Sequence, residues 1–167
     1  AFRLDGLLTR LRERCPQLAA VEARFVHFVA VADELPDDDQ QVLARLLDYG
    51  EPLETDPTGC LVLVVPRIGT ISPWASKATD IAHNCGLTGV RRIERGIAYY
   101  LRDGGGRPIS QADAHSLSDL LHDRMTESVL ADTEQAVALF EAHEPSPLAS
   151  VDILGGGREA LRAADAE

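Results

Sequence analysis

Hydrophobic positions recur along the chain at two spacings, and together they predict helices interspersed with strands. Residues 4–14 and 37–49 place leucine and valine three or four positions apart, as on one face of a helix. Residues 21–31, 60–65 and 90–102 instead alternate, or run continuously hydrophobic with many β-branched side chains, as strands do. The pattern predicts an α+β fold.

A third helix is predicted directly after the buried strand that Pro66 ends, since proline has no N–H to donate to a sheet. Residues 67–72 are then a loop. Ser72 is a suitable N-cap, and Pro73 suits the first helical position of a helix over residues 73–84. The free N–H groups of its first turn would suit an anion.

This third helix has one hydrophobic and one polar face. The residues expected to be buried are Ala78, Ile81, Ala82 and Cys85. The polar face has two possible interpretations: a solvated surface with a weak Lys77–Asp80 ion pair, or a binding surface. The polar residues are Ser76, Lys77, Asp80, His83 and Asn84.

The C-terminal part is predicted to be helical and then to become a linker. Ser110 is expected to cap a long helix that reaches about Leu130 and buries Met125 among other side chains. A proline-rich stretch and a run of three glycines follow, as expected for a hinge. We therefore predict an N-terminal domain over residues 1–145 and the start of a linker region over residues 146–167.

Composition narrows the class of protein. A hydrophobic content of 45% in 167 residues is enough for a substantial core. The formal net charge of -11 disfavours nucleic acid, and no apolar run is long enough to span a membrane. Without a signal peptide, a cytoplasmic location is expected. Three cysteines without metal-ligand spacing are expected to be buried, reduced thiols: Cys15, Cys60 and Cys85.

Two further features have alternative interpretations. His27 lies among hydrophobic neighbours, so a hydrogen-bonded core histidine is favoured over a ligand or an acid–base group. Arg91, Arg92 and Arg95 either form the outer face of a strand or help to hold a phosphate or an acidic neighbouring domain. The sequence contains no nucleophile–base set, metal-ligand cluster or dinucleotide fingerprint, so we predict no catalytic residue, metal ligand or cofactor site.

Several segments resemble the N-terminal region of the large, single-chain phosphoribosylformylglycinamidine synthases. The most specific is Pro66–Leu87, which holds the chain's only lysine and only tryptophan, in Gly69-Thr-Ile-Ser-Pro-Trp74 and Ser76-Lys-Ala-Thr-Asp-Ile-Ala-His83. The other matching segments are Val26–Phe28, Arg92–Tyr100, Leu121–Glu127 and Ser150–Leu154. Ala75 and Phe25 depart from the serine and tyrosine usual in the family at these places.

The resemblance implies part of a ligase that converts formylglycinamide ribonucleotide to its amidine in purine biosynthesis, using ATP, Mg²⁺ and ammonia from glutamine. The nucleophile of the glutaminase and the residues that bind ATP and Mg²⁺ lie in later domains of this family. The chain alone is therefore not expected to turn over substrate. It would pack on the synthetase domain, help to form the substrate site and support the passage of ammonia. A non-catalytic assembly subunit of a multi-chain enzyme is the alternative.

The resemblance also implies a fold and a site. Residues 21–65 and 90–129 would form two pseudo-repeated strand–helix halves, like a fused dimer of the family's small partner subunit. Arg67 and Lys77 would offset phosphate charge, Ser72 would cap it, and Trp74 would anchor the domain interface. The candidates for contact with the ribonucleotide or the synthetase domain are Arg67, Thr70, Ser72, Trp74, Ser76, Lys77, Asp80 and His83.

Overall fold

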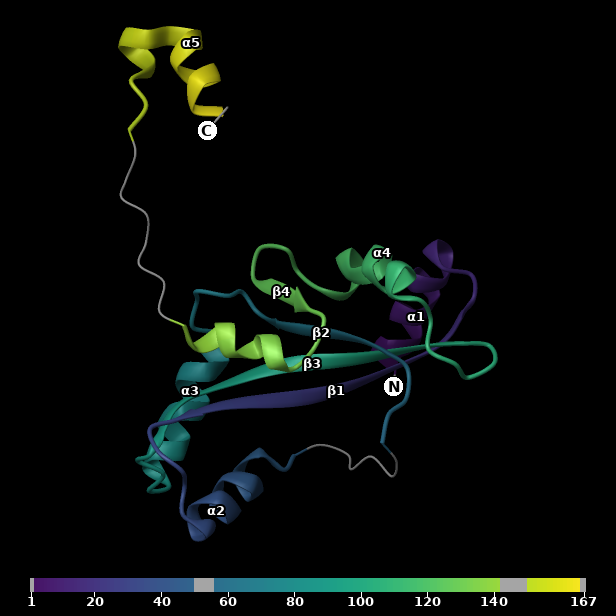
Figure 1. Cartoon of the computed structure of the whole chain (residues 1–167), viewed down its shortest axis with the longest axis vertical. Helices are drawn as coiled ribbons and strands as arrows, with labels where there is room; N and C mark the ends of the chain where they lie inside the picture. The colour runs from purple at the N-terminus through teal and green to yellow at the C-terminus, as the bar shows by residue number, and fades with distance from the viewer. Residues whose placement is uncertain (1, 50–55, 142–149, 166–167) are drawn as a thin grey trace.

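A computed structural model describes residues 2–49, 56–141 and 150–165 and confirms the α+β class (Figure 1). Its centre is a four-stranded antiparallel sheet with the strand order β1-β3-β2-β4. The strands are β1 (Leu18–Val31), β2 (Cys60–Pro66), β3 (Val90–Asp103) and β4 (Glu127–Leu130).

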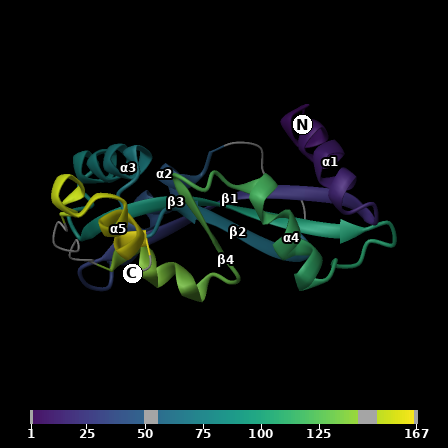
Figure 2. The same cartoon turned by 90° about the horizontal axis from the view of Figure 1, so that it is seen from above.

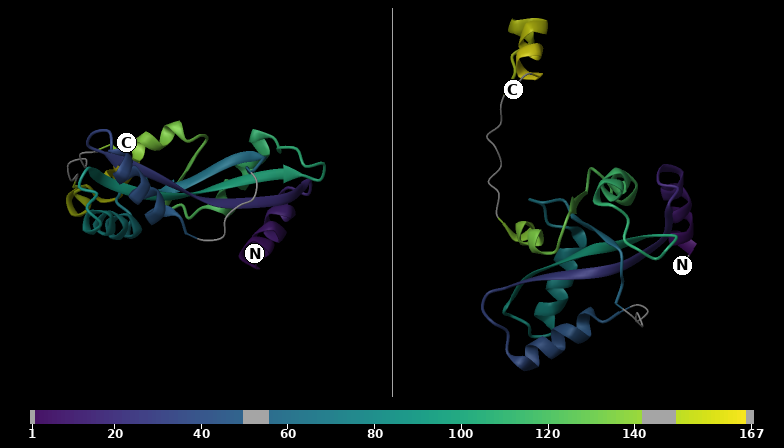
Figure 3. Two further views of the ribbon diagram at one scale, coloured as in Figure 1. Left: turned by 90° about the horizontal axis from the view of Figure 1, so that it is seen from below. Right: turned by 45° about the vertical axis from the view of Figure 1, so that its right-hand side comes forward.

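Five α-helices and one 3₁₀ helix are described around or beyond this sheet. Helix α1 and helix α3 lie at opposite ends of one side of the sheet (Figure 3), and the yellow-green 3₁₀ helix lies on the other side (Figure 2). The helices are α1 (Phe2–Arg14), α2 (Asp37–Leu47), α3 (Pro73–Asn84), α4 (Gln111–Leu121), the 3₁₀ helix η1 (Glu134–Phe140) and α5 (Ile153–Asp165).

Alternate residues of each strand enter different hydrophobic clusters, because successive side chains of a strand point to opposite faces. On β3, Tyr99 and Leu101 pack with α1 and α4, and Ile93 packs with α2 and α3. Ala98 and Tyr100 belong instead to the cluster that η1 covers. The alternation predicted for residues 21–31 and 90–102 is thereby confirmed.

The two predicted halves interleave in the sheet. Strands β1 and β2 enclose β3, and β3 and β4 enclose β2, so each half contributes two parallel strands separated by a strand of the other half. The two central strands therefore come from different halves. The likeness to a fused dimer of a small partner subunit stays a prediction.

The predicted length of the helix after Ser110 is wrong. Ser110 does cap α4, and its Oγ accepts the N–H of Asp113 at 3.1 Å, but the helix ends at Leu121. The chain then turns, and Glu127–Leu130 pairs with β2. Met125, expected in the core, is 74% exposed in this turn. Residues 127–130 form a strand despite their helical spacing, because pairing with β2 gives them backbone hydrogen bonds and burial that a helix would not.

The described C-terminal segment stands apart from the sheet (Figure 1). Helix α5 has no buried residue, and Gly157 interrupts its helical geometry at φ 55°. The predicted boundary between residues 145 and 146 lies outside the described residues, so the domain division stays a prediction. Within the described part of the chain, no helix has the length and hydrophobicity required to cross a membrane.

Candidate functional site

The start of α3 forms as the sequence predicts. Ser72 has extended backbone angles, and its Oγ accepts the N–H of Ala75 at 3.0 Å, while Pro73 occupies the first turn. The preceding loop is anchored at its other end, where the N–H of Arg67 donates to the carbonyl of Thr126 at 2.9 Å. Thr70 closes the loop by donating its hydroxyl to the carbonyl of Arg67 at 2.6 Å.

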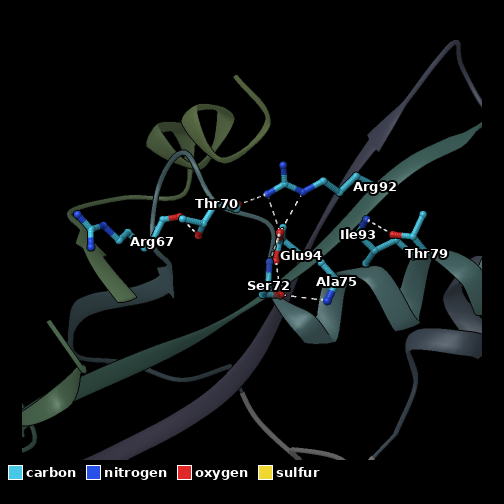
Figure 4. A network of polar contacts seen from close by, with 8 residues as sticks. All are labelled: Arg67, Thr70, Ser72, Ala75, Thr79, Arg92, Ile93 and Glu94. Carbon is cyan, nitrogen blue, oxygen red and sulfur yellow. Dashed lines mark hydrogen bonds and ion pairs between the residues drawn. The ribbon is translucent and has the colours of Figure 1, made fainter. Parts of the chain in front are cut away.

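A buried carboxylate of β3 occupies the anion position at this helix start (Figure 4). Glu94 is fully buried, and its Oε2 accepts the Ser72 hydroxyl at 2.8 Å. Its Oε1 accepts the Ser72 N–H at 3.4 Å and two guanidinium N–H groups of Arg92 at 2.9 and 2.6 Å. The first turn of α3 therefore already holds an anion that belongs to the protein.

Aromatic rings enclose a second arginine of β3. The Arg95 guanidinium lies 4.3 Å from the ring centre of Phe25 and 4.8 Å from that of Trp74. It also donates to the hydroxyl oxygen of Tyr49 at 3.3 Å. Because a stacked guanidinium is held in one orientation, Arg95 is fixed while it retains its positive charge.

His27 completes this cluster through the same tyrosine. Its Nε2 lies 2.7 Å from the Tyr49 hydroxyl oxygen, and its ring packs edge-on against the tyrosine ring. Burial lowers the pKa of His27 from its ordinary value of 6.5, and the nearby charge of Arg95 lowers it further. His27 is hydrogen-bonded as predicted, but it is only half-buried, so its placement in the core is wrong.

The loop, β3 and the turn before β4 enclose a cleft of about 480 Å³. Arg67 and Arg95 both line it, and so do Thr70 and Ser72. Three large hydrophobic side chains among its lining residues are strongly exposed: Phe25 at 52%, Ile71 at 63% and Met125 at 74%. The cleft thus combines two cations with an uncovered hydrophobic rim.

A second, mostly apolar cavity of about 210 Å³ lies between α2 and α3. Lys77 and Trp74 line it together with Tyr49 and leucines of α2. The structure therefore places Arg67 and Lys77, both expected to offset phosphate charge, in different cavities. Trp74 connects the two regions, because it lines the second cavity and stacks on Arg95, which lines the first.

The other polar residues of α3 do not join either cavity. Ser76 and Asp80 are exposed, and among the described residues no ion pair joins Asp80 to Lys77. His83 instead connects the end of α3 to β3, because its Nε2 lies 2.7 Å from the carbonyl oxygen of Val90. Of the eight predicted site residues, Arg67, Thr70 and Ser72 share the cleft, and Trp74 and Lys77 share the apolar cavity.

The buried face of α3 is narrower than the sequence indicated. Ala75 and Ala82 are fully buried and Ala78 is half-buried, whereas Ile81 is 46% exposed. Cys85 is also exposed, so the expectation of three buried thiols is wrong for this cysteine and confirmed for the other two. The small side chains of Ala78 and Ala82 pack in a cluster with Ile93 of β3, whereas Ile81 lines the apolar cavity.

Sequence reasoning missed Glu94 and gave too little weight to Arg95. The usable signal for Glu94 was Arg92 two positions earlier, since residues i and i+2 of a strand share a face. No pattern in the sequence indicated that Phe25, Tyr49 and Trp74 converge, because they come from β1, from the residues after α2 and from α3. Within the described residues, no group of histidine, cysteine and carboxylate side chains is arranged to hold a metal ion.

Comparison with known families supports the resemblance seen in the sequence. Residues 24–140 match the family model described as formylglycinamide ribonucleotide amidotransferase N-terminal. The match includes β1 from residue 24 onward, the cleft, both central strands and η1, and it covers more than half of the chain. The chain therefore belongs to the family of N-terminal domains of formylglycinamide ribonucleotide amidotransferase.

Proposed function

We propose that this chain is the N-terminal segment of an ATP- and glutamine-dependent ligase that converts formylglycinamide ribonucleotide to formylglycinamidine ribonucleotide. In this role it packs on the synthetase domain and forms one wall of the substrate site. The observation that carries the proposal is the cleft beside Arg67 and Arg95 in a chain of this family. ATP, Mg²⁺ and glutamine are bound by other domains of the same enzyme.

The rim of the cleft suits contact with another domain. Phe25, Ile71 and Met125 expose large hydrophobic surfaces around a hollow, an arrangement typical of interaction sites. A domain that covers them would exclude water from the cleft. Exclusion of water matters in this reaction, because an activated amide intermediate would otherwise hydrolyse before ammonia attacks it.

The charges of the cleft suit the ribonucleotide. Its phosphate is an anion, and Arg67 and Arg95 are the cations that line the hollow within a chain of net charge -11. Glu127 also lines the cleft, as the one acidic residue among its described lining residues, and its Oε2 accepts the N–H of Asp123 at 2.8 Å. We assign the phosphate to the two arginines, and Lys77 with Trp74 to contact with the synthetase domain.

Steady-state kinetics of the complete enzyme test this assignment. Arg67→Ala should raise the KM for formylglycinamide ribonucleotide by about tenfold or more, because a hydrogen bond between charged groups is lost. Lys77→Ala should also weaken use of this substrate, but less, because Lys77 lines the other cavity. Hydrolysis of glutamine alone should be unchanged in both variants.

Arg10→Ala provides the matched control, since Arg10 is an exposed residue of α1, the helix at the end of the sheet opposite α3 (Figure 3). It should leave the KM unchanged. If Arg67→Ala gave the same KM as Arg10→Ala, the cleft would not bind the ribonucleotide and the proposal would be wrong.

A further inference from the structure

Glu94 is a fully buried carboxylate whose burial needs a reason. Removing a charge from water is costly, and a hydrophobic residue of similar size would often stabilise a core as well or better. Here the cost is offset by four hydrogen bonds, two from Arg92 and two from Ser72. Such complete pairing is typical of a group that specifies one local conformation.

The conformation that Glu94 specifies is that of the loop beside the cleft (Figure 4). Ser72, at the end of the loop, is bound directly through its N–H and its hydroxyl. Thr70 is bound indirectly, because the Arg92 guanidinium that pairs with Glu94 also donates to the Thr70 carbonyl at 2.8 Å. One carboxylate on a central strand therefore holds two backbone positions that flank Ile71.

The same contacts leave Ser72 no free donor for a substrate anion. The Ser72 N–H and hydroxyl both point to Glu94, and the Ser72 oxygen accepts the Ala75 N–H. A phosphate at this position would have to displace a buried carboxylate of the same charge. Side chains of the loop and of Arg95 line the cleft and can face a ligand there.

We propose that Glu94 is a positioning residue of the substrate site, acting through Ser72 and Arg92 to hold residues 67–72 against the cleft. The inference rests on the proposed function, because it assumes that the cleft receives the ribonucleotide. Glu94 itself does not touch substrate. Its effect is to keep Arg67 and Ile71 in place on the wall of the cleft.

The test is Glu94→Gln in the complete enzyme, a substitution of nearly equal size that removes the charge and one acceptor oxygen. We expect the KM for formylglycinamide ribonucleotide to rise by about tenfold, since a displaced binding group is costly. Hydrolysis of glutamine alone should be unchanged. Hydrogen exchange of residues 67–75, followed by mass spectrometry, should become faster than in the parent enzyme.

Two capping serines provide a matched pair that separates positioning from general stability. Ser72 and Ser110 each accept the N–H three residues ahead, at 3.0 and 3.1 Å, and each donates to a carboxylate, at 2.8 and 2.6 Å. Ser110 begins α4, whose residues do not line the cleft. Ser72→Ala should reproduce the kinetic effect of Glu94→Gln, whereas Ser110→Ala should lower the melting temperature without raising the KM.

The outcomes distinguish this inference from the proposed function. An elevated KM in Arg67→Ala together with a parental KM in Glu94→Gln and Ser72→Ala would overturn the positioning role alone. An unchanged KM in Arg67→Ala would overturn the proposed function, and faster exchange of residues 67–75 in Glu94→Gln would still support the anchoring of the loop. An equal rise of KM in Ser110→Ala would show a loss of stability and would overturn the positioning role.

Discussion

At the scale of single residues, neighbours decide what each charged side chain does. Arg92 and Arg95 lie three positions apart on β3. Because side chains of a strand alternate between its two faces, these two point to opposite faces. Arg92 pairs with a buried carboxylate and holds a loop, whereas Arg95 lies between two aromatic rings and lines the cleft. Identical side chains thus serve structure in one place and the candidate site in the other.

His27 should make stability depend on pH. Because its folded-state pKa is lowered, the unfolded chain binds more protons between that value and 6.5. The free energy of unfolding should therefore rise with pH through this interval, and the contribution of His27 should be lost as the pH falls below 6.5. Urea unfolding of the parent and of His27→Gln at several pH values would measure the difference.

A direct titration provides the control for this prediction. The ring signal of His27, identified in an NMR spectrum by its absence in His27→Gln, should have a midpoint below 6.5. A midpoint at or above 6.5 would contradict the effects attributed to burial and to Arg95.

At the scale of elements, close packing around the cleft depends on residues that lack a large side chain. Gly96 of β3 lines the cleft and lies against β2, where a Cβ atom would come within 2.8 Å of the Val64 carbonyl oxygen. Ala75 and Ala82 similarly let α3 lie near β3. The cleft wall therefore has little room for additional atoms.

Gly96→Ala should destabilise the domain by about 1–3 kcal/mol, because the strands must shift to accept the methyl group. Gly104→Ala is the matched control, since a Cβ atom at this turn would have no other atom within 4 Å. Its effect should be no more than about 0.5 kcal/mol. Urea unfolding of the two variants measures both changes in the free energy of unfolding. Equal unfolding midpoints would contradict the predicted clash.

At the scale of the whole molecule, the packed part is the sheet with α1 to α4 and η1. Its three hydrophobic clusters draw on these elements and on the connections between them, whereas α5 contributes no buried residue. The large hydrophobic side chains of α5 are exposed, and Leu154 is fully so. Stability should therefore reside in the residues before Glu141.

A chain ending at Ala149 should keep the melting temperature of the parent chain within about 2 °C, because no buried contact of α5 is lost. Trp74, the only tryptophan, reports unfolding of the packed part by fluorescence. A chain beginning at Cys15 is the control: it lacks the fully buried Leu11 and should lose more than about 2 kcal/mol. A large loss on removing α5 would contradict this division.

The sequence alone determined the elements whose ends and buried positions depend on neighbouring residues. Helix α3 has its predicted limits, because Ser72 and Pro73 begin it and the signals of capping act between neighbours. The alternation of β1 and β3 was equally readable, since a strand buries every second residue. The family could also be predicted, because the unusual segment from Pro66 to Leu87 is continuous.

Only the tertiary structure decided what depends on partners distant in sequence. Residues 127–130 are a strand because β2 offers them a ladder, a fact absent from their own helical spacing. The burial of Glu94 and the stacking of Arg95 arise where β1, β3 and the start of α3 meet. Local patterns report the free energy of local conformations, whereas the site depends on contacts that form only once the sheet brings separate segments together.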